Sequence, residues 1–87
     1  MSADAVRVLL FATLRQMAGA SVVELTISGD RTVGGCWDEL CAQMPQLSSQ
    51  RQVVRPAVNR TYVGWDTPVC DGDELAFIPP VSGGYRE

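Results

Sequence analysis

Apolar and polar residues alternate with the period of a β-strand near both ends of the chain. The alternation and the β-forming residues predict strands over residues 6–11, 22–27 and 74–78, and shorter strands over residues 56–59 and 61–64. Between the first two strands, residues 12–18 carry good helix formers and are followed by Gly19, a helix stop signal. Because the first two strands flank a short helical segment, we expect them to form an antiparallel hairpin with a long loop, and Ser28-Gly29-Asp30 predicts a turn after the second strand.

A helical period begins after Thr32, a residue suited to cap a helix N-terminus. Apolar residues then recur at helical spacing along one stripe: Val33, Cys36, Trp37, Leu40, Cys41 and Met44. Pro45 ends the pattern, and the polar residues 46–55 predict a loop with at most a short helical turn. The order of these elements predicts an α+β fold, a mixed sheet of four to five strands packed on one main helix.

The alternation also predicts an exposed apolar patch. Side chains of successive strand residues point to opposite faces, and the face of the first strand that carries Arg7 is expected to point outward. If the first and last strands are neighbours, the patch comprises Leu9, Phe11, Ala76 and Ile78. A patch of this kind marks a partner surface, although a second buried face or scattered apolar residues would give the same pattern.

Composition narrows the chemistry open to the chain. With 87 residues, 46% of them hydrophobic and 20% charged, the chain is expected to form one folded domain. It contains no histidine and no lysine, which removes the commonest general base and any Schiff-base lysine. The net charge of −3 without a basic cluster argues against nucleic acid and anionic membranes as partners. No secretory leader or membrane-spanning run is visible, so the cytoplasm is the expected compartment.

The three cysteines, Cys36, Cys41 and Cys70, leave one unpaired in any disulfide scheme, which suits a reducing compartment. The spacing of Cys36 and Cys41 is that of the first cysteine pair in plant-type ferredoxins, but the adjoining C-x2-C and a fourth ligand are missing. We therefore expect all three to act as small hydrophobic residues, two on the helix and Cys70 beside a strand.

The segment that follows the last predicted strand is unusual. It reads Pro79-Pro80-Val81-Ser82-Gly83-Gly84-Tyr85-Arg86-Glu87. The two prolines favour an extended path, and the two glycines would fit a narrow channel that excludes any Cβ atom. A frayed, glycine-rich terminus is the alternative interpretation. The predicted organisation is a folded domain over residues 1–78 and an extended, flexible tail over residues 79–87.

Three stretches of the chain resemble the small, sulfur-carrier subunit of molybdopterin synthase, the MoaD-type family related to the thiamine sulfur carrier. They are residues 8–15 with Ala18-Gly19, residues 57–59, and residues 71–84, of which the last is long and specific. The resemblance implies a ubiquitin-like β-grasp fold and a non-catalytic carrier subunit of a sulfurtransferase complex. It also implies that Phe11, Phe77 and Ile78 serve packing or partner docking, and that Arg15, which matches a family arginine, is a further partner-binding residue.

The resemblance further implies chemistry at Gly84. A ubiquitin-activating-like enzyme would use ATP and magnesium to form an acyl-adenylate there, and a sulfur donor protein would convert it to a thiocarboxylate. The tail, Pro79, Pro80, Val81, Ser82 and Gly83, would insert into the large synthase subunit within a heterotetramer. The sulfur would then pass to cyclic pyranopterin monophosphate to build the dithiolene of molybdopterin. The chain itself would bind no cofactor or metal.

The chain departs from this pattern because Tyr85-Arg86-Glu87 follows the two glycines. A peptidase could remove the three residues, the chain could be a paralogue that no longer carries sulfur, or the residues could stem from an altered or fused form of the protein. Two other functions stay open: a β-grasp sulfur carrier for thiamine or cysteine synthesis, and a ubiquitin-like docking or tagging module without sulfur chemistry.

Overall fold

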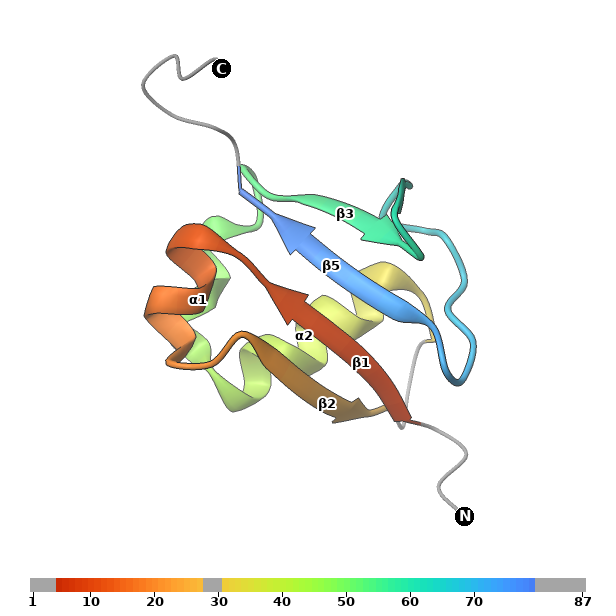
Figure 1. The fold of residues 1–87 in the computed structure, drawn as a ribbon, viewed down its shortest axis with the longest axis horizontal. Coiled ribbons are helices and arrows are strands. Elements are labelled where there is room, and N and C mark those ends of the chain that lie inside the picture. The colour runs from red at the N-terminus through yellow and green to blue at the C-terminus, as the bar shows by residue number, and fades with distance from the viewer. Residues whose placement is uncertain (1–4, 28–30, 80–87) are drawn as a thin grey trace.

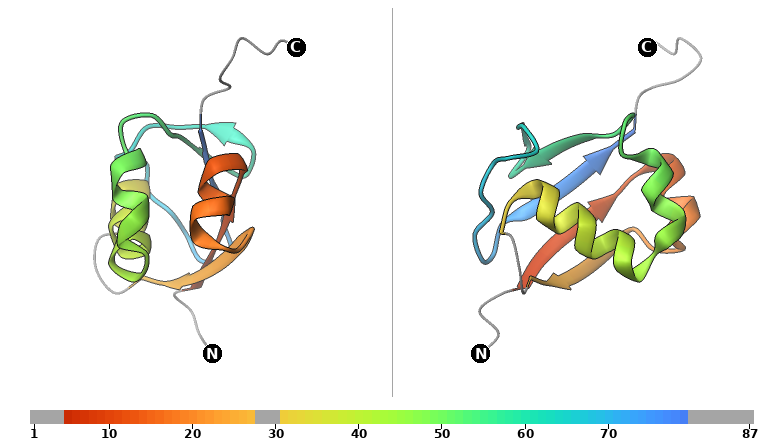
Figure 2. Two further views of the ribbon diagram at one scale, coloured as in Figure 1. Left: turned by 90° about the vertical axis from the view of Figure 1, so that its left-hand side faces the viewer. Right: turned by 180° about the vertical axis from the view of Figure 1, so that it is seen from behind.

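Five strands form one mixed sheet, and the longest helix lies across one of its faces (Figures 1 and 2). The structure, a computed structural model, describes residues 5–27 and 31–79. The elements in chain order are β1 Ala5–Leu10, α1 Ala12–Ala18, β2 Val22–Thr26, α2 Val33–Gln43, the 3-10 helix η1 Pro45–Gln50, β3 Arg55–Val58, β4 Thr61–Tyr62 and β5 Glu74–Ile78. The expected α+β arrangement of a mixed sheet on one main helix is confirmed.

The two ends of the described chain meet in the middle of the sheet. The strand order is β2-β1-β5-β3-β4, with β1 and β5 parallel and the other neighbours antiparallel. Because β1 and β5 run in the same direction, both end at the same edge of the molecule, beside α1 (Figure 1). The last strand therefore ends beside the residue that follows the first strand, Phe11.

Local sequence signals explain where the helices begin and end. Gly19 follows α1 with a φ of 76°, a left-handed conformation that glycine adopts without strain, and its N–H donates to the Arg15 carbonyl. The Thr32 side chain caps α2 by accepting a hydrogen bond of 3.1 Å from the Gly35 N–H. Pro45 opens η1 directly after α2, so the predicted loop begins with a short helical segment.

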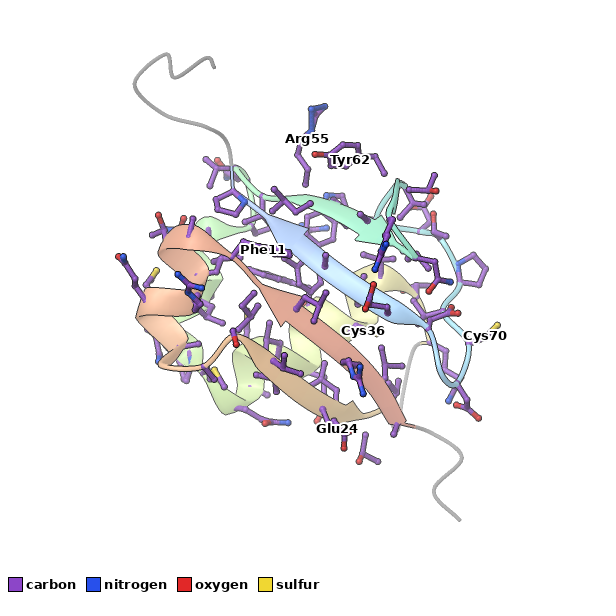
Figure 3. All side chains as sticks on the ribbon, in the orientation of Figure 1. Phe11, Glu24, Cys36, Arg55, Tyr62 and Cys70 are labelled. Carbon is purple, nitrogen blue, oxygen red and sulfur yellow. The ribbon has the colours of Figure 1, made fainter. Side chains whose placement is uncertain are left out.

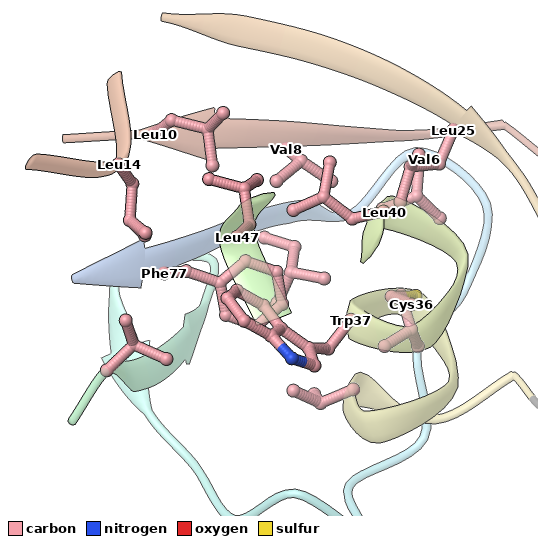
Figure 4. Close-up of a cluster of buried hydrophobic side chains, with 14 of the residues drawn as sticks. Val6, Val8, Leu10, Leu14, Leu25, Cys36, Trp37, Leu40, Leu47 and Phe77 are labelled. Carbon is pink, nitrogen blue, oxygen red and sulfur yellow. The ribbon is translucent and has the colours of Figure 1, made fainter. Parts of the chain in front are cut away.

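The apolar stripe of α2 packs into the hydrophobic core (Figure 4). The four buried residues of the helix are Val33, Cys36, Trp37 and Leu40. They pack against the inward faces of β1 and β5, where Val8, Leu75 and Phe77 are fully buried. Complete burial of such side chains stabilises the fold by about 1.5–3 kcal/mol each, so the stripe and the two central strands carry most of the packing energy.

The three cysteines lie in three different environments, which corrects the expectation that all of them act as small hydrophobic residues. Cys36 is buried and Cys41 is half-buried on α2, but Cys70 is exposed. The reason is the turn that follows Cys70: Asp73 accepts a 2.8 Å hydrogen bond from the Cys70 N–H and donates its own N–H to the Cys70 carbonyl. This turn keeps Cys70 at the surface.

Candidate docking surface at the end of β5

The open face of the sheet, opposite α2, contains a shallow hollow of about 390 Å³. Its lining comes from four strands and the turns that follow two of them: Leu9, Phe11, Ala57, Arg60, Tyr62, Glu74, Ala76 and Ile78. Two of these are large, exposed aromatic side chains, with Phe11 42% and Tyr62 63% accessible. Exposed aromatic residues around an apolar hollow are typical of a surface that a partner protein covers.

Strand alternation and register together build the hollow. On β5 the side chains of Leu75 and Phe77 point into the core, so Ala76 and Ile78 lie on the open face. The parallel pairing with β1 places Leu9 opposite Ala76. The predicted neighbourhood of Leu9, Phe11, Ala76 and Ile78 is therefore confirmed, and none of the four belongs to a second buried core.

One end of the hollow is polar and well ordered by hydrogen bonds. Asn59 and Arg60 connect β3 to β4 with φ values of 50° and 73°, as in a tight hairpin turn with two left-handed residues. The Asn59 side chain accepts from the Glu74 N–H at 3.0 Å and donates to Asp73 at 3.1 Å. Arg60 lies 3.7 Å from the Glu74 carboxylate across this end. These contacts tie the β3–β4 turn to the start of β5.

The other end of the hollow lies where the chain leaves β5. Aromatic side chains pack against this end of the strand on the core side of the sheet. The Phe77 ring contacts Trp37 edge-on with centroids 4.8 Å apart and stacks on Trp65 at 5.9 Å. Ile78 follows directly on the open face, and the half-buried Pro79 ends the described chain. Such aromatic contacts contribute about 0.5–1.5 kcal/mol each beyond burial, so the root of the tail leaves from a rigid platform.

The structure separates the four residues expected to serve packing or docking. Phe11 and Ile78 line the hollow. Figure 3 shows Phe11 near the ends of β1 and β5. Phe77 is fully buried in the core, so its side chain offers no contact surface to a partner. Arg15 is exposed on α1 and does not line the hollow. The expected tail residues Pro80, Val81, Ser82, Gly83 and Gly84 lie outside the described residues.

The hollow is also lined by four residues that the sequence did not predict as site residues: Ala57, Arg60, Tyr62 and Glu74. Tyr62 carried the one available signal, an aromatic residue in a short polar strand. Tyr62 and Ile78 line the same hollow because β5 lies between β1 and β3. Alternation along a single strand does not predict this strand order.

The cysteines and carboxylates of the described residues are possible metal ligands and nucleophiles. Within residues 5–27 and 31–79, no three Cys, Asp or Glu side chains are placed to hold a metal ion. Burial, followed by the neighbouring Asp38 carboxylate, raises the pKa of the Cys41 thiol above its ordinary value. A half-buried thiol held in its neutral form is a poor nucleophile.

The helices of residues 5–27 and 31–79 are all too short or too polar to span a membrane.

Comparison with known proteins assigns the chain to one protein family. The family model described as the ThiS family matches residues 8–84. The molybdopterin synthase sulfur carrier subunit of Arabidopsis thaliana is 39% identical over 79 residues, covering 91% of this chain and 82% of the relative. The subunit of the same name from Escherichia coli is 37% identical over 81 residues, covering 91% of this chain and 99% of the relative.

A solved structure gives the same picture of the fold. The crystal structure of SAMP1 from Haloferax volcanii superposes with a TM-score of 0.80 at 32% identity, covering 92% of this chain and 99% of that one. This agreement confirms the ubiquitin-like β-grasp fold that the resemblance implied.

Proposed function

Because this chain belongs to the ThiS family, we propose that it is the sulfur carrier subunit of molybdopterin synthase. The family match carries this proposal, since it runs through residue 84 and so includes Gly83 and Gly84 together with the folded domain. The names of the relatives from Arabidopsis thaliana and Escherichia coli support molybdopterin synthesis as the pathway.

In the proposed cycle the chain supplies a carboxylate and its position, and partners supply the catalysis. An adenylating enzyme transfers AMP from ATP, with magnesium as its ion, to the Gly84 carboxylate, and pyrophosphate leaves. A sulfur donor protein supplies hydrosulfide, whose sulfur attacks the acyl carbon; the bond from this carbon to the AMP phosphate oxygen breaks, AMP leaves, and Gly84 carries a thiocarboxylate. The large synthase subunit receives this group and passes the sulfur to cyclic pyranopterin monophosphate. Positioning alone can lower such barriers substantially, so the carrier needs no acid–base residue of its own.

The apolar hollow supplies the proposed docking function. Phe11 and Ile78 flank the point where the tail begins, so a partner seated on the hollow meets the tail directly. The sheet face is rigid and its aromatic rim is already exposed, which limits the entropy lost on binding. We place the large synthase subunit on this face, in a complex that acts in the cytoplasm.

The extension after Gly84 must be removed for this chemistry. The Gly84 carbonyl is part of the peptide bond to Tyr85 as long as Tyr85-Arg86-Glu87 is present. An amide carbonyl has no carboxylate oxygen to attack ATP, so a peptidase is the first enzyme of the proposed cycle.

Intact mass spectrometry of the protein from its native cells tests the proposal. We expect a species that ends at Gly84 and carries sulfur in place of one carboxyl oxygen. A protein that still ends at Glu87 while the cells make molybdenum cofactor would show that the chain is not the working carrier.

A second experiment distinguishes molybdopterin synthesis from thiamine and cysteine synthesis. The trimmed thiocarboxylate is added to the large synthase subunit, and dithiolene formation is followed.

Protein modification is the second candidate function, and one observation favours it. Small archaeal modifier protein 1 of Haloferax volcanii is 35% identical over 83 residues. A modifier would also use an activated Gly84 but would attach it to a lysine of another protein. An isopeptide-linked adduct on a second protein, with no thiocarboxylate, would identify this function.

A further inference from the structure

A second hollow adjoins the docking surface on the far side of Tyr62. Its lining comes from β3, the residue before it, β4 and the segment after β4: Val54, Arg55, Pro56, Tyr62, Val63, Gly64 and Trp65. Tyr62 lines both hollows and is 63% exposed, so it forms the ridge between them. The second hollow is also close to the tail, because Arg55 pairs with Ile78 in the sheet.

Two arginines stack on aromatic rings around this second hollow. The Arg51 guanidinium lies 4.1 Å from the centre of the Trp65 ring, and the Arg55 guanidinium lies 5.7 Å from that of Tyr62. Figure 3 shows the Arg55 and Tyr62 side chains next to each other above β3. Stacking restricts a guanidinium while its N–H edge stays free, since that edge cannot donate to the ring beneath it.

Neither arginine has an acidic partner among the described residues. Ion pairs to carboxylates hold Arg31 and Arg60, but within residues 5–27 and 31–79 no carboxylate lies within 4.0 Å of Arg51 or Arg55. None of the residues that line the second hollow is an aspartate or a glutamate. The chain has ten acidic residues and a net charge of −3, so two neighbouring unpaired arginines do not reflect a shortage of carboxylates.

Three of the ten acidic residues lie at the opposite end of β5. Asp71, Asp73 and Glu74 lie in the turn before this strand and at its first position, where they pair with Arg31, Asn59 and Arg60. Positive charge therefore faces outward near the tail, and negative charge lies at the far end of the same strand. A partner that approaches the tail meets the arginines before it meets any of these carboxylates.

We propose that the docking surface continues from the apolar hollow over Tyr62 to Arg51 and Arg55, which bind carboxylates that the large synthase subunit carries beside its tail channel. The inference rests on the proposed function, because it takes the large subunit as the protein seated on the open face. A planar, pre-ordered guanidinium matches a carboxylate through two parallel N–H···O bonds. Charges placed at the edge of an interface act mainly by accelerating association.

Association kinetics with the large synthase subunit of the same organism test the proposal. In separate variants Arg51→Gln and Arg55→Gln, we expect the association rate constant at low salt to fall by about 3- to 10-fold, and its salt dependence to become weaker. Arg7→Gln is the matched control, because Arg7 is also an exposed arginine, but it lies at the other end of β1. This control removes the same charge and should change the rate constant less than about twofold.

The outcomes separate this inference from the proposed function. If the wild-type chain binds and the Arg51 and Arg55 variants associate as fast as the Arg7 variant, the arginines do not contact the partner and the inference is overturned. If the wild-type chain does not bind the large subunit at all, the proposed docking function fails together with the inference. Arg55 is exposed, and thermal unfolding of each variant shows whether a slower rate reflects lost folding.

Discussion

At the scale of single residues, two neighbouring positions of one turn play opposite parts. Asn59 and Arg60 both adopt positive φ values, yet only Asn59 uses its side chain to bond the backbone and Asp73. Arg60 is held in the left-handed region by the hairpin, and its contact to Glu74 is exposed. Position 60 therefore carries strain that glycine would not have, whereas position 59 does not gain from such a change.

We expect Arg60→Gly to raise the free energy of unfolding by about 1 kcal/mol, because glycine removes the left-handed penalty of a side chain. Asn59→Gly should lower it by about 1 kcal/mol, since two hydrogen bonds disappear. Urea unfolding of the two variants measures both values. Equal effects of the same sign would show that backbone conformation does not control this turn.

The three thiols should react with iodoacetamide in the order Cys70, Cys41, Cys36, because Cys70 is exposed and Cys36 is buried. Burial raises the pKa of Cys41, so its rate should rise only at a pH above the ordinary thiol value of 9.0. The folded state then keeps its proton where the unfolded thiol has already ionised, so Cys41 makes the fold less stable as the pH rises above 9.0. Peptide mass spectrometry of timed samples gives the three rates, and early alkylation of Cys36 would contradict the packing of α2.

At the scale of elements, the side chains of β5 alternate between the core and the open face of the sheet. One face of the strand contributes Leu75 and Phe77 to the core, and the other presents Ala76 and Ile78 to the hollow. A single strand thus connects the stability of the fold with the surface on which a partner is proposed to dock.

Ile78→Asp should weaken binding to the large synthase subunit by at least tenfold and leave thermal unfolding nearly unchanged, because Ile78 lies on the open face. Phe77→Ala is the contrasting variant and should cost about 3–5 kcal/mol of stability, since it leaves a cavity beside Trp37 and Trp65. Calorimetry of both variants, with a binding titration of Ile78→Asp, checks the division. A loss of stability in Ile78→Asp as large as that in Phe77→Ala would assign Ile78 to the core.

At the scale of the whole molecule, the topology brings the start and the end of the fold together. The parallel pairing of β1 with β5 places Phe11 and Ile78 at one edge, where the tail begins, and the carboxylates of residues 71–74 lie at the other. The proposed working end of the molecule is therefore built from residues that are far apart in sequence.

Gly83→Val should abolish sulfur transfer to the large subunit while the free energy of unfolding stays within about 0.5 kcal/mol of the wild type. The added side chain would clash in the proposed narrow channel of the large subunit, and Gly83 follows the last strand in the sequence. Dithiolene formation from the trimmed thiocarboxylate measures transfer, and urea unfolding is the control. Full activity of the valine variant would contradict the threaded tail.

The sequence by itself determined the local features of this protein. Alternation and β-forming residues identified β1, β2 and β5, and they showed which residues of β1 and of β5 share a face. The helical stripe from Val33 to Met44 identified α2 and its buried side. Thr32 and Gly19 marked helix ends because capping and left-handed turns depend on a few adjacent residues. The resemblance of residues 71–84 indicated the family, which the family match confirmed.

Only the tertiary structure decided which of these features meet. Alternation says which residues share a face of one strand, but not which strand lies beside it. The position of β5 between β1 and β3 buried Phe77, and the β3–β4 hairpin placed Tyr62 on the rim of the hollow. The turn after Cys70 likewise held that thiol at the surface. These outcomes depend on contacts between residues distant in the chain, whose free energy is gained only when the whole sheet closes.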